Sequence, residues 1–201
     1  MKVWITVVFT LIFCGSASAN SPNLLVLGDS LSAAFGIEQQ RGWVALLQNR
    51  LDQKNHDYQV INASISGETS SGGLSRLPAL LQRYQPSIVI LALGANDGLR
   101  GLSIKQMQTN LSSIIEQSKH EAAAVLLIGI QLPPNYGPAY TQQFQDAFNQ
   151  LAASQNVPLV PSLVNGIGEN KAMFQQDGLH PTAEAQPTIL DNLWPSLEQL
   201  L

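Results

Sequence analysis

The chain has 201 residues, of which 45% are hydrophobic and 12% charged, and its formal net charge is -4. This length fills one ordinary domain and is too short for two, so we expect a single domain over residues 20–201. Basic residues form no cluster that could follow a phosphate backbone, which argues against nucleic acid as a partner.

Residues 1–19 have the pattern of a secretory signal peptide. Lys2 precedes the apolar run Val3–Phe13, and Ala17-Ser18-Ala19 offers small residues to a signal peptidase. A run of about eleven apolar residues cannot cross ~30 Å of hydrocarbon, which takes roughly 20 residues in a helix. We therefore expect cleavage after the tripeptide, no stable membrane anchor in the mature form, and a periplasmic or secreted protein that begins at Asn20.

Cys14 is the only cysteine. The sequence Leu11-Ile12-Phe13-Cys14 resembles a bacterial lipoprotein signal, but Phe13 stands where such signals carry a small residue, so simple cleavage is favoured over lipidation. Cleavage after Ala19 leaves a mature chain without cysteine, which excludes disulfides, thiol catalysis and thiolate metal sites.

Apolar strands and amphipathic helices alternate through the rest of the chain. The expected strands are Asn23–Leu27, Tyr58–Asn62, Ser87–Leu93, Ala124–Ile130 and Val157–Val160. The expected helices are Gln40–Lys54, Leu74–Tyr84, Ile104–His120, a glutamine-rich segment that carries Phe144, Ala147, Phe148 and Leu151, and a last helix from about Thr182 to Leu201.

This alternation predicts right-handed βαβ crossovers and therefore an α/β fold. We expect a three-layer αβα sandwich of flavodoxin-like type, with a five-stranded parallel sheet. Ligands bind such sheets outside the carboxyl ends of the strands, where the strand order reverses. The turns that hold Ser30, Gly67 and Asn96 each follow an expected strand, so all three belong at that edge.

Gly28-Asp29-Ser30-Leu31-Ser32 follows the first strand and leads into a segment of helical pattern. A serine at the end of a buried strand is presented at the top of the sheet, although serines in this position also serve as ordinary helix caps. A hydroxyl is a poor nucleophile at neutral pH, so a catalytic Ser30 requires a base, usually a neutral imidazole.

The chain offers three histidines. His56 lies in a polar run and His120 ends a helix beside charged neighbours, which is typical of solvated side chains. His180 differs because Asp177 lies three residues before it in Asp177-Gly178-Leu179-His180-Pro181. That carboxylate can accept the Nδ1 proton and leave Nε2 facing a hydroxyl. From the pentapeptide alone, a local turn contact between the two residues remains equally open.

Acyl transfer also needs hydrogen-bond donors aimed at the developing oxyanion. The candidates are the amide of Ser30, the amide of Gly67 and the carboxamide of Asn96. Considered alone, Gly67 can be interpreted as an ordinary turn glycine, and Asn96 as an Asx residue that forms a turn. The hypothesis depends on their conjunction with a nucleophile and a base.

Four blocks resemble, in order and spacing, those of the SGNH (GDSL-type) hydrolases, and they span essentially the whole mature chain. They are Gly28–Ser32, Gly67, Gly94-Ala95-Asn96-Asp97 and Asp177–Pro181. Within that family the chain looks closest to the exported bacterial group of multifunctional thioesterase I/protease I/lysophospholipase L1 and arylesterase. The similar segments are Asn96–Gly101, Asn135-Tyr136-Gly137, His180-Pro181 and Ala185-Gln186-Pro187.

The resemblance implies that Ser30 is the nucleophile, His180 the base and Asp177 its orienting partner. It implies an oxyanion hole formed by the Ser30 and Gly67 amides and the Asn96 side chain, and a reaction that needs no metal or cofactor. This chain departs from its relatives at Ala95, where they often have glycine, and at Pro138, where a basic residue is expected. Acyl-chain preference is therefore not carried over.

Together these features predict a monomeric serine esterase whose partner is a small-molecule acyl ester or thioester, such as an aryl ester, a lysophospholipid or acyl-CoA. The reaction would pass through an acyl-enzyme on Ser30. Four apolar residues are expected to line an acyl groove, although each also suits an ordinary core position. They are Leu74, Leu99, Ile104 and Tyr136.

Two rival functions remain open at this point. A carbohydrate or peptidoglycan O-acetylesterase would use the same residues and prefer acetyl esters. A non-catalytic binding module would instead hold phosphate at the helix start after Ser30, and would not need Asp177 or His180.

Overall fold

The computed structural model describes residues 21–201. The expected signal peptide, residues 1–19 with Cys14, lies outside the described residues, so cleavage and lipidation stay predictions. Within residues 21–201 no helix is both long enough and apolar enough to cross a membrane.

Five parallel strands form one sheet in the order β2-β1-β3-β4-β5. The strands are β1 (Asn23–Gly28), β2 (Gln59–Asn62), β3 (Ile88–Ala92), β4 (Ala124–Ile128) and β5 (Leu159–Val160). This is the flavodoxin-like order predicted from the sequence. Because β2 and β3 lie on opposite sides of β1, the order reverses at the carboxyl end of β1, where Ser30 follows.

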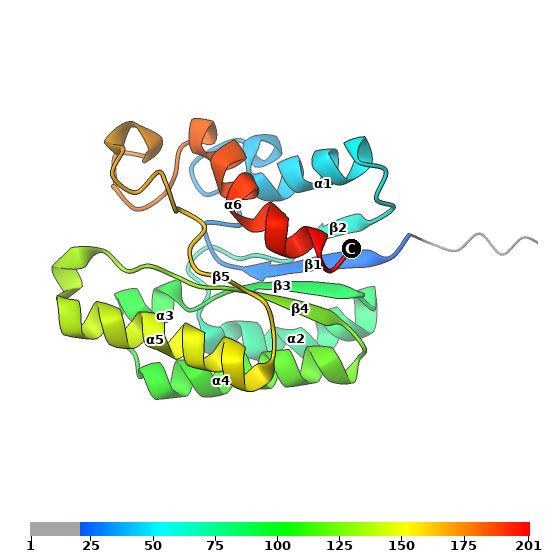
Figure 1. Ribbon diagram of the computed structural model, residues 1–201, viewed down its shortest axis with the longest axis horizontal. Coiled ribbons are helices and arrows are strands. Elements are labelled where there is room, and N and C mark those ends of the chain that lie inside the picture. The colour runs from blue at the N-terminus through cyan, green and yellow to red at the C-terminus, as the bar shows by residue number, and fades with distance from the viewer. Residues whose placement is uncertain (1–20) are drawn as a thin grey trace, which may run out of the picture.

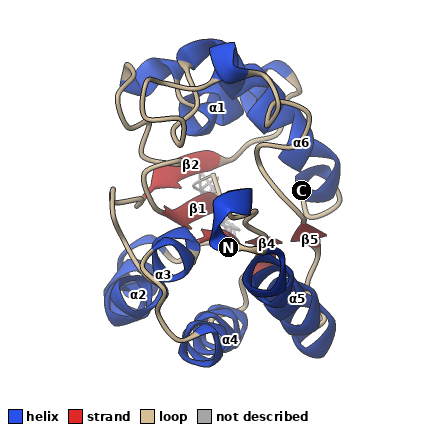
Figure 2. Cartoon of the chain, turned by 90° about the vertical axis from the view of Figure 1, so that its left-hand side faces the viewer, coloured by secondary structure: helices blue, strands red, loops and turns tan. Residues whose placement is uncertain are grey.

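Helices cover both faces of the sheet and make the predicted three layers (Figures 1 and 2). One face carries α1 (Trp43–Gln53) and α6 (Gln186–Glu198). The other carries α2 (Ser70–Tyr84), the short α3 (Ala95–Leu99), α4 (Ile104–His120) and α5 (Pro138–Gln155).

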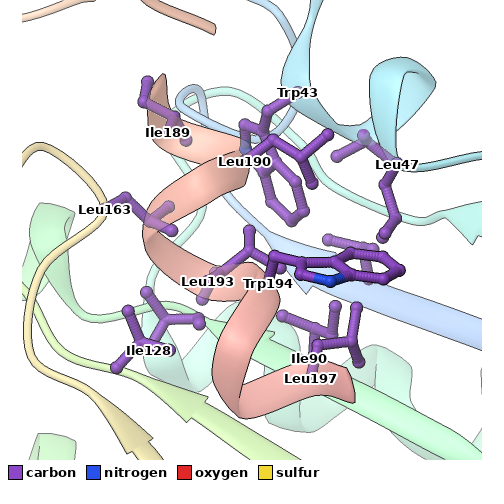
Figure 3. Packing of buried hydrophobic residues seen from close by; sticks show 14 of the residues in the cluster. Trp43, Leu47, Ile90, Ile128, Leu163, Ile189, Leu190, Leu193, Trp194 and Leu197 are labelled. Carbon is purple, nitrogen blue, oxygen red and sulfur yellow. The ribbon is translucent and has the colours of Figure 1, made fainter. Parts of the chain in front are cut away.

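The alternation of side chains along the central strands divides the core in two. In β1, Leu24 and Val26 join the cluster under α1 and α6, whereas Leu25 and Leu27 join the cluster against the other helices. All four are fully buried, as expected for a parallel strand covered on both faces. Figure 3 shows the first cluster, in which Trp43 from α1 lies beside side chains of α6.

The start of α2 differs from the prediction. The sequence predicts that this helix starts at Leu74, but it begins four residues earlier, at Ser70. The Thr69 hydroxyl accepts a hydrogen bond from the Gly72 amide, which caps the first turn. The Ser70 hydroxyl donates to the Asp97 carboxylate over 2.6 Å. A cap and a tertiary anchor therefore override the weak helix propensity of serine and glycine.

Other boundaries also differ. β5 has two residues rather than four, and α6 starts at Gln186 after a 3₁₀ turn at Ala183–Ala185. The helix α3 was not predicted. Gly94 opens it with a φ of +116°, and its five residues are too few to give a periodic pattern.

Candidate active site

The position of Ser30, the candidate nucleophile, is built by the end of β1. Asp29 is 1% exposed, and its Oδ1 accepts the Leu31 amide over 3.1 Å while its carbonyl accepts the Ala33 amide over 2.9 Å. Gly28 allows the turn to close, because a Cβ there would lie 2.6 Å from Ser32 Oγ. Ser32 itself is buried in the same turn, and Ser30 projects from a turn that is fixed on both sides.

The structure brings Asp177, His180 and Ser30 into one line of hydrogen bonds. Asp177 Oδ2 lies 2.6 Å from His180 Nδ1, and His180 Nε2 lies 2.9 Å from Ser30 Oγ. The other carboxylate oxygen, Oδ1, accepts the amides of Leu179 over 2.9 Å and His180 over 3.0 Å. The carboxylate therefore fixes both the backbone of the turn and the orientation of the imidazole.

These hydrogen bonds lower the pKa of Asp177 from its ordinary 3.8 to about 2, chiefly through the His180 and Leu179 amides and then the His180 side chain. Asp177 is consequently a carboxylate at neutral pH. An ionised Asp177 accepts the Nδ1 proton, which leaves Nε2 as the acceptor for the Ser30 hydroxyl.

The loop that carries the histidine is joined to the connection that follows β1. The Gln175 amide donates to the His180 carbonyl over 2.8 Å, and the Gln175 side chain donates to the Phe35 carbonyl over 2.8 Å. The Phe35 ring lies 4.4 Å from the imidazole, centroid to centroid. Hydrogen bonds and ring contact together hold His180 above the end of β1.

The three expected oxyanion donors come from three neighbouring connections. Asn96 Nδ2 donates one hydrogen to the Glu68 carbonyl over 2.9 Å, which orients the carboxamide and leaves its second hydrogen for a ligand. Within residues 21–201, the amides of Ser30 and Gly67 donate no hydrogen bond to the chain. Gly67 has a φ of +81°, a conformation that favours glycine.

Two arginines that the sequence pattern did not single out fasten the loop of Gly67. Arg100 donates to the Gly67 carbonyl over 2.9 Å. Arg76 pairs with the Glu68 carboxylate and also donates to the Ala63 carbonyl over 2.9 Å. For the contact of Arg76 with Glu68, the sequence offered one signal: Glu68 stands among small residues, eight positions before Arg76.

A buried polar network ties this side of the site together. The Asp97 carboxylate accepts the Ser70 amide over 2.8 Å as well as its hydroxyl, and Asn110 donates to the Ser70 hydroxyl over 3.0 Å. These residues belong to α3, α2 and α4 and are at most 6% exposed. The network fixes Asp97 and so the position of Asn96 beside it.

Ser30, His180 and Asn96 open into a cleft of about 820 Å³. Its walls come from the connections after β4 and β5, and both contain stretches without regular structure. The apolar side chains that line it are Leu31, Leu99, Ile130, Leu132, Val164, Phe174 and Leu179.

Of the four residues expected to line an acyl groove, Leu99 alone lines this cleft. Leu74 and Ile104 are partly buried and pack against the core cluster on the α2, α4 and α5 face. Tyr136 is 37% exposed and donates to the Leu99 carbonyl over 3.0 Å. Leu74 in α2 and Ile104 in α4 thus serve the core, and apart from Leu99 the larger apolar side chains of the cleft come from loops, where they follow no period.

The other two histidines lie away from the site. His120 is 86% exposed and contacts Glu121. The ring of His56 lies 6.2 Å from the Trp194 ring on α6.

A serine, histidine and aspartate in hydrogen-bond sequence at the switch point of an αβα sandwich define a serine hydrolase. The chain belongs to the GDSL-like Lipase/Acylhydrolase family, whose model matches residues 26–186. This confirms the predicted family, and with it an enzyme that hydrolyses acyl esters.

Known relatives cover nearly the whole chain. It is 52% identical to the esterase TesA of Pseudomonas aeruginosa over 183 residues, 91% of each chain. It is 41% identical over 184 residues to the thioesterase 1/protease 1/lysophospholipase L1 of Escherichia coli K12, covering 92% of this chain and 87% of the relative. The crystal structure of TesA superposes with a TM-score of 0.88 at 52% identity, covering 89% of this chain and 99% of that one.

Proposed function

We propose that this chain is an exported serine esterase that cleaves acyl esters and thioesters through an acyl-enzyme on Ser30. The observation that carries the proposal is the continuous contact from Asp177 through His180 to Ser30, at 2.6 Å and 2.9 Å. Each residue type in it is the one that nucleophilic acyl transfer requires.

In the first half-reaction, Ser30 Oγ attacks the substrate carbonyl carbon while His180 Nε2 takes the hydroxyl proton. The negative charge that develops on the carbonyl oxygen is met by the Ser30 and Gly67 amides and the free Asn96 hydrogen. Asp177 stabilises the imidazolium. When the intermediate collapses, the bond to the leaving alcohol or thiol breaks, and that group receives the proton from His180.

In the second half-reaction, water attacks the acyl-enzyme as His180 removes one of its protons. The same donors meet the second oxyanion, and the bond to Ser30 Oγ breaks. His180 returns its proton to the serine, and the carboxylic acid leaves. The enzyme is regenerated, and side chains supply every proton transfer.

The apolar cleft beside Ser30 supports acyl groups longer than acetyl, which favours aryl esters, lysophospholipids and acyl-CoA over a carbohydrate O-acetyl group. The name of the Escherichia coli relative includes thioesterase and lysophospholipase. Cleavage of residues 1–19 would deliver a single-domain enzyme of residues 20–201 to the periplasm or the exterior as a monomer, without a membrane anchor.

The test is a panel of p-nitrophenyl esters of increasing chain length, with acyl-CoA and lysophosphatidylcholine, on protein produced from the full chain. We expect turnover of medium-chain esters and of at least one thioester, and none with Ser30→Ala. Activity that survives Ser30→Ala, or that is confined to acetyl esters, would count against the proposal.

A further inference from the structure

The exposed large apolar side chains of residues 21–201 share one location. They are Phe35, Ile65, Leu102, Tyr136 and Leu179, and between 37% and 48% of each is exposed. Each lies on the connection that follows a different strand, from β1 to β5 in chain order. In a parallel sheet these connections all lie at the carboxyl edge, so the five side chains gather there. We call them the apolar rim.

Three members of the rim lie at the mouth of the cleft. The Phe35 ring contacts the His180 ring at 4.4 Å, Leu179 lines the cleft, and the Tyr136 hydroxyl donates to the carbonyl of Leu99, which also lines it. These contacts place three members of the rim directly at the opening.

The other two members flank the oxyanion side of the site. The Ile65 carbonyl accepts the Glu68 amide over 3.1 Å, in the turn that contains Gly67. The Leu102 amide donates to the Asp97 carbonyl over 2.9 Å, next to Asn96. Their backbones take part in these turns, but their side chains are 48% and 45% exposed and do not line the cleft.

Apolar side chains scattered singly over a surface are ordinary, whereas a group gathered around one opening marks a binding surface. Charge limits what that surface binds. The five connections are residues 29–42, 63–69, 93–103, 129–137 and 161–185. They contain seven acidic and three basic residues. Two of the acidic residues, Asp29 and Asp97, are buried, but the other five still outnumber the basic ones, so this surface does not attract an anionic membrane.

We propose that the apolar rim docks on the surface of a zwitterionic lipid aggregate, from which an acyl ester passes directly into the cleft. The proposal rests on the proposed function for the identity of that ester. Interfacial binding of this kind scales with the apolar area that enters the headgroup region. A second copy of the chain is the poorer occupant, because an isologous contact through the rim would close both clefts against substrate.

The test uses Ser30→Ala protein, so that binding is measured without turnover, and phosphatidylcholine vesicles that are sedimented and assayed for bound protein. The double substitution Ile65→Gln/Leu102→Gln in the same background removes two apolar side chains outside the cleft. The matched control is Leu80→Gln. This residue is half-buried in α2, ten positions after Ser70 and therefore about 15 Å from the carboxyl edge.

We expect the Ser30→Ala protein to bind the vesicles, the double substitution to weaken binding by about tenfold, and Leu80→Gln to leave it unchanged. With Ser30 present, the double substitution should lower by a similar factor the ratio of kcat/KM on a vesicle-borne ester to that on soluble p-nitrophenyl acetate. Thermal unfolding of each variant shows whether it is folded.

Absence of vesicle binding, equal binding by the double variant, or equal loss in Leu80→Gln would overturn the proposal. So would a dimer, detected by light scattering, that the double substitution dissociates. Hydrolysis of soluble esters without vesicle binding would remove the docking surface and leave the esterase. Vesicle binding without any ester hydrolysis would support the docking surface and contradict the proposed esterase activity.

Discussion

The two halves of the candidate active site are held in place by different forces. Ser30 follows a strand whose four leucine and valine residues are fully buried, and Asp29 before it is 1% exposed. Asp177 and His180 instead lie on the long connection after the two-residue strand β5, and the Asp177 side chain is 41% exposed. Burial of the preceding residues fixes Ser30, whereas short-range hydrogen bonds fix His180.

Because of this contrast, substitutions in the two halves should affect different quantities, the rate of the reaction in one half and the free energy of unfolding in the other. Asp177 and His180 belong to neither hydrophobic cluster of the core, so their removal should affect the reaction far more than the free energy of unfolding. Residues of the buried half are part of the core, so their ionisation and packing should appear in stability. Each substitution below tests one side of that division.

The largest effect is expected for His180→Gln. Without the base, kcat on a p-nitrophenyl ester should fall by about 10⁴-fold or more, because the serine proton has no acceptor. The free energy of unfolding should change by less than about 1 kcal/mol, since the side chain, 21% exposed, belongs to neither hydrophobic cluster of the core. Steady-state kinetics and urea unfolding measure the two quantities.

His120→Gln is the matched control, because that side chain is 86% exposed, lies at the last residue of α4 and does not line the cleft. It should alter neither quantity. If His180→Gln unfolded the protein, the histidine loop would be a structural element and the division between the halves would be wrong.

Asp177→Asn and Asp177→Ala should distinguish the two roles of this residue, which are to stabilise the imidazolium and to accept the two amides of the turn. Asparagine keeps an oxygen for the Leu179 and His180 amides but loses the charge that stabilises the imidazolium, so kcat should fall by about 10³- to 10⁴-fold with little loss of stability. Alanine should cost a similar factor in kcat and an additional 1 kcal/mol or so in stability, because two turn amides lose their acceptor.

The dependence of the free energy of unfolding on pH in acid solution gives an independent check on Asp177. Its pKa is lowered from 3.8 in the unfolded chain to about 2 in the folded one. The stability it contributes is therefore present above about pH 4 and lost as pH falls toward 2. Unfolding curves between pH 2 and 5 should show this loss in the parent and not in Asp177→Asn. A common pH dependence would contradict the assigned hydrogen bonds.

The sequence predicted those parts of the molecule that local pattern determines. Ile104–His120 was predicted to the residue, because its apolar period is regular and Ser103 caps it through the Gln106 amide. The parallel sheet with helices on both faces followed from buried strands that alternate with helices. Ser30 and His180, 150 residues apart, were paired by motif and by the chemistry that a serine nucleophile needs.

What the sequence did not predict depends on contacts between distant segments. Arg100 donates to the Gly67 carbonyl, 33 positions away in the sequence, and no local sequence pattern indicates such a hydrogen bond. Val164 and Ile130 line the cleft from irregular loops, whereas Leu74, whose helical spacing suggested a groove, packs in the core. Tertiary context decides which apolar side chains meet solvent.

A smaller loss of activity is expected for Asn96→Ala. Removal of one oxyanion donor typically costs about 10²- to 10³-fold in kcat. The substitution also leaves the Glu68 carbonyl without its 2.9 Å donor, so a modest loss of stability should accompany it. A fall in kcat at unchanged KM supports a role in the transition state. A change in KM alone would assign Asn96 to substrate binding instead.

Asp29→Asn probes the buried half and should change kcat least, by no more than about threefold, because the amide oxygen can still accept the Leu31 amide. The main effect of this substitution should be on the free energy of unfolding. Burial raises the pKa of Asp29 from 3.8 to about 6, so the unfolded chain ionises first as pH rises. The free energy of unfolding should then fall between pH 4 and 6 and level off above, by at most about 3 kcal/mol at roughly 1.4 kcal/mol for each pH unit.

The asparagine variant should lack this decline and be the more stable protein at pH 8. Urea unfolding of both proteins from pH 4 to 8 isolates the effect, since burial is the largest cause of the raised pKa of Asp29 and the asparagine variant lacks this carboxyl. Parallel curves would mean that the carboxyl ionises freely in the folded state, and the turn that presents Ser30 would then owe its fixed position to its hydrogen bonds and not to burial.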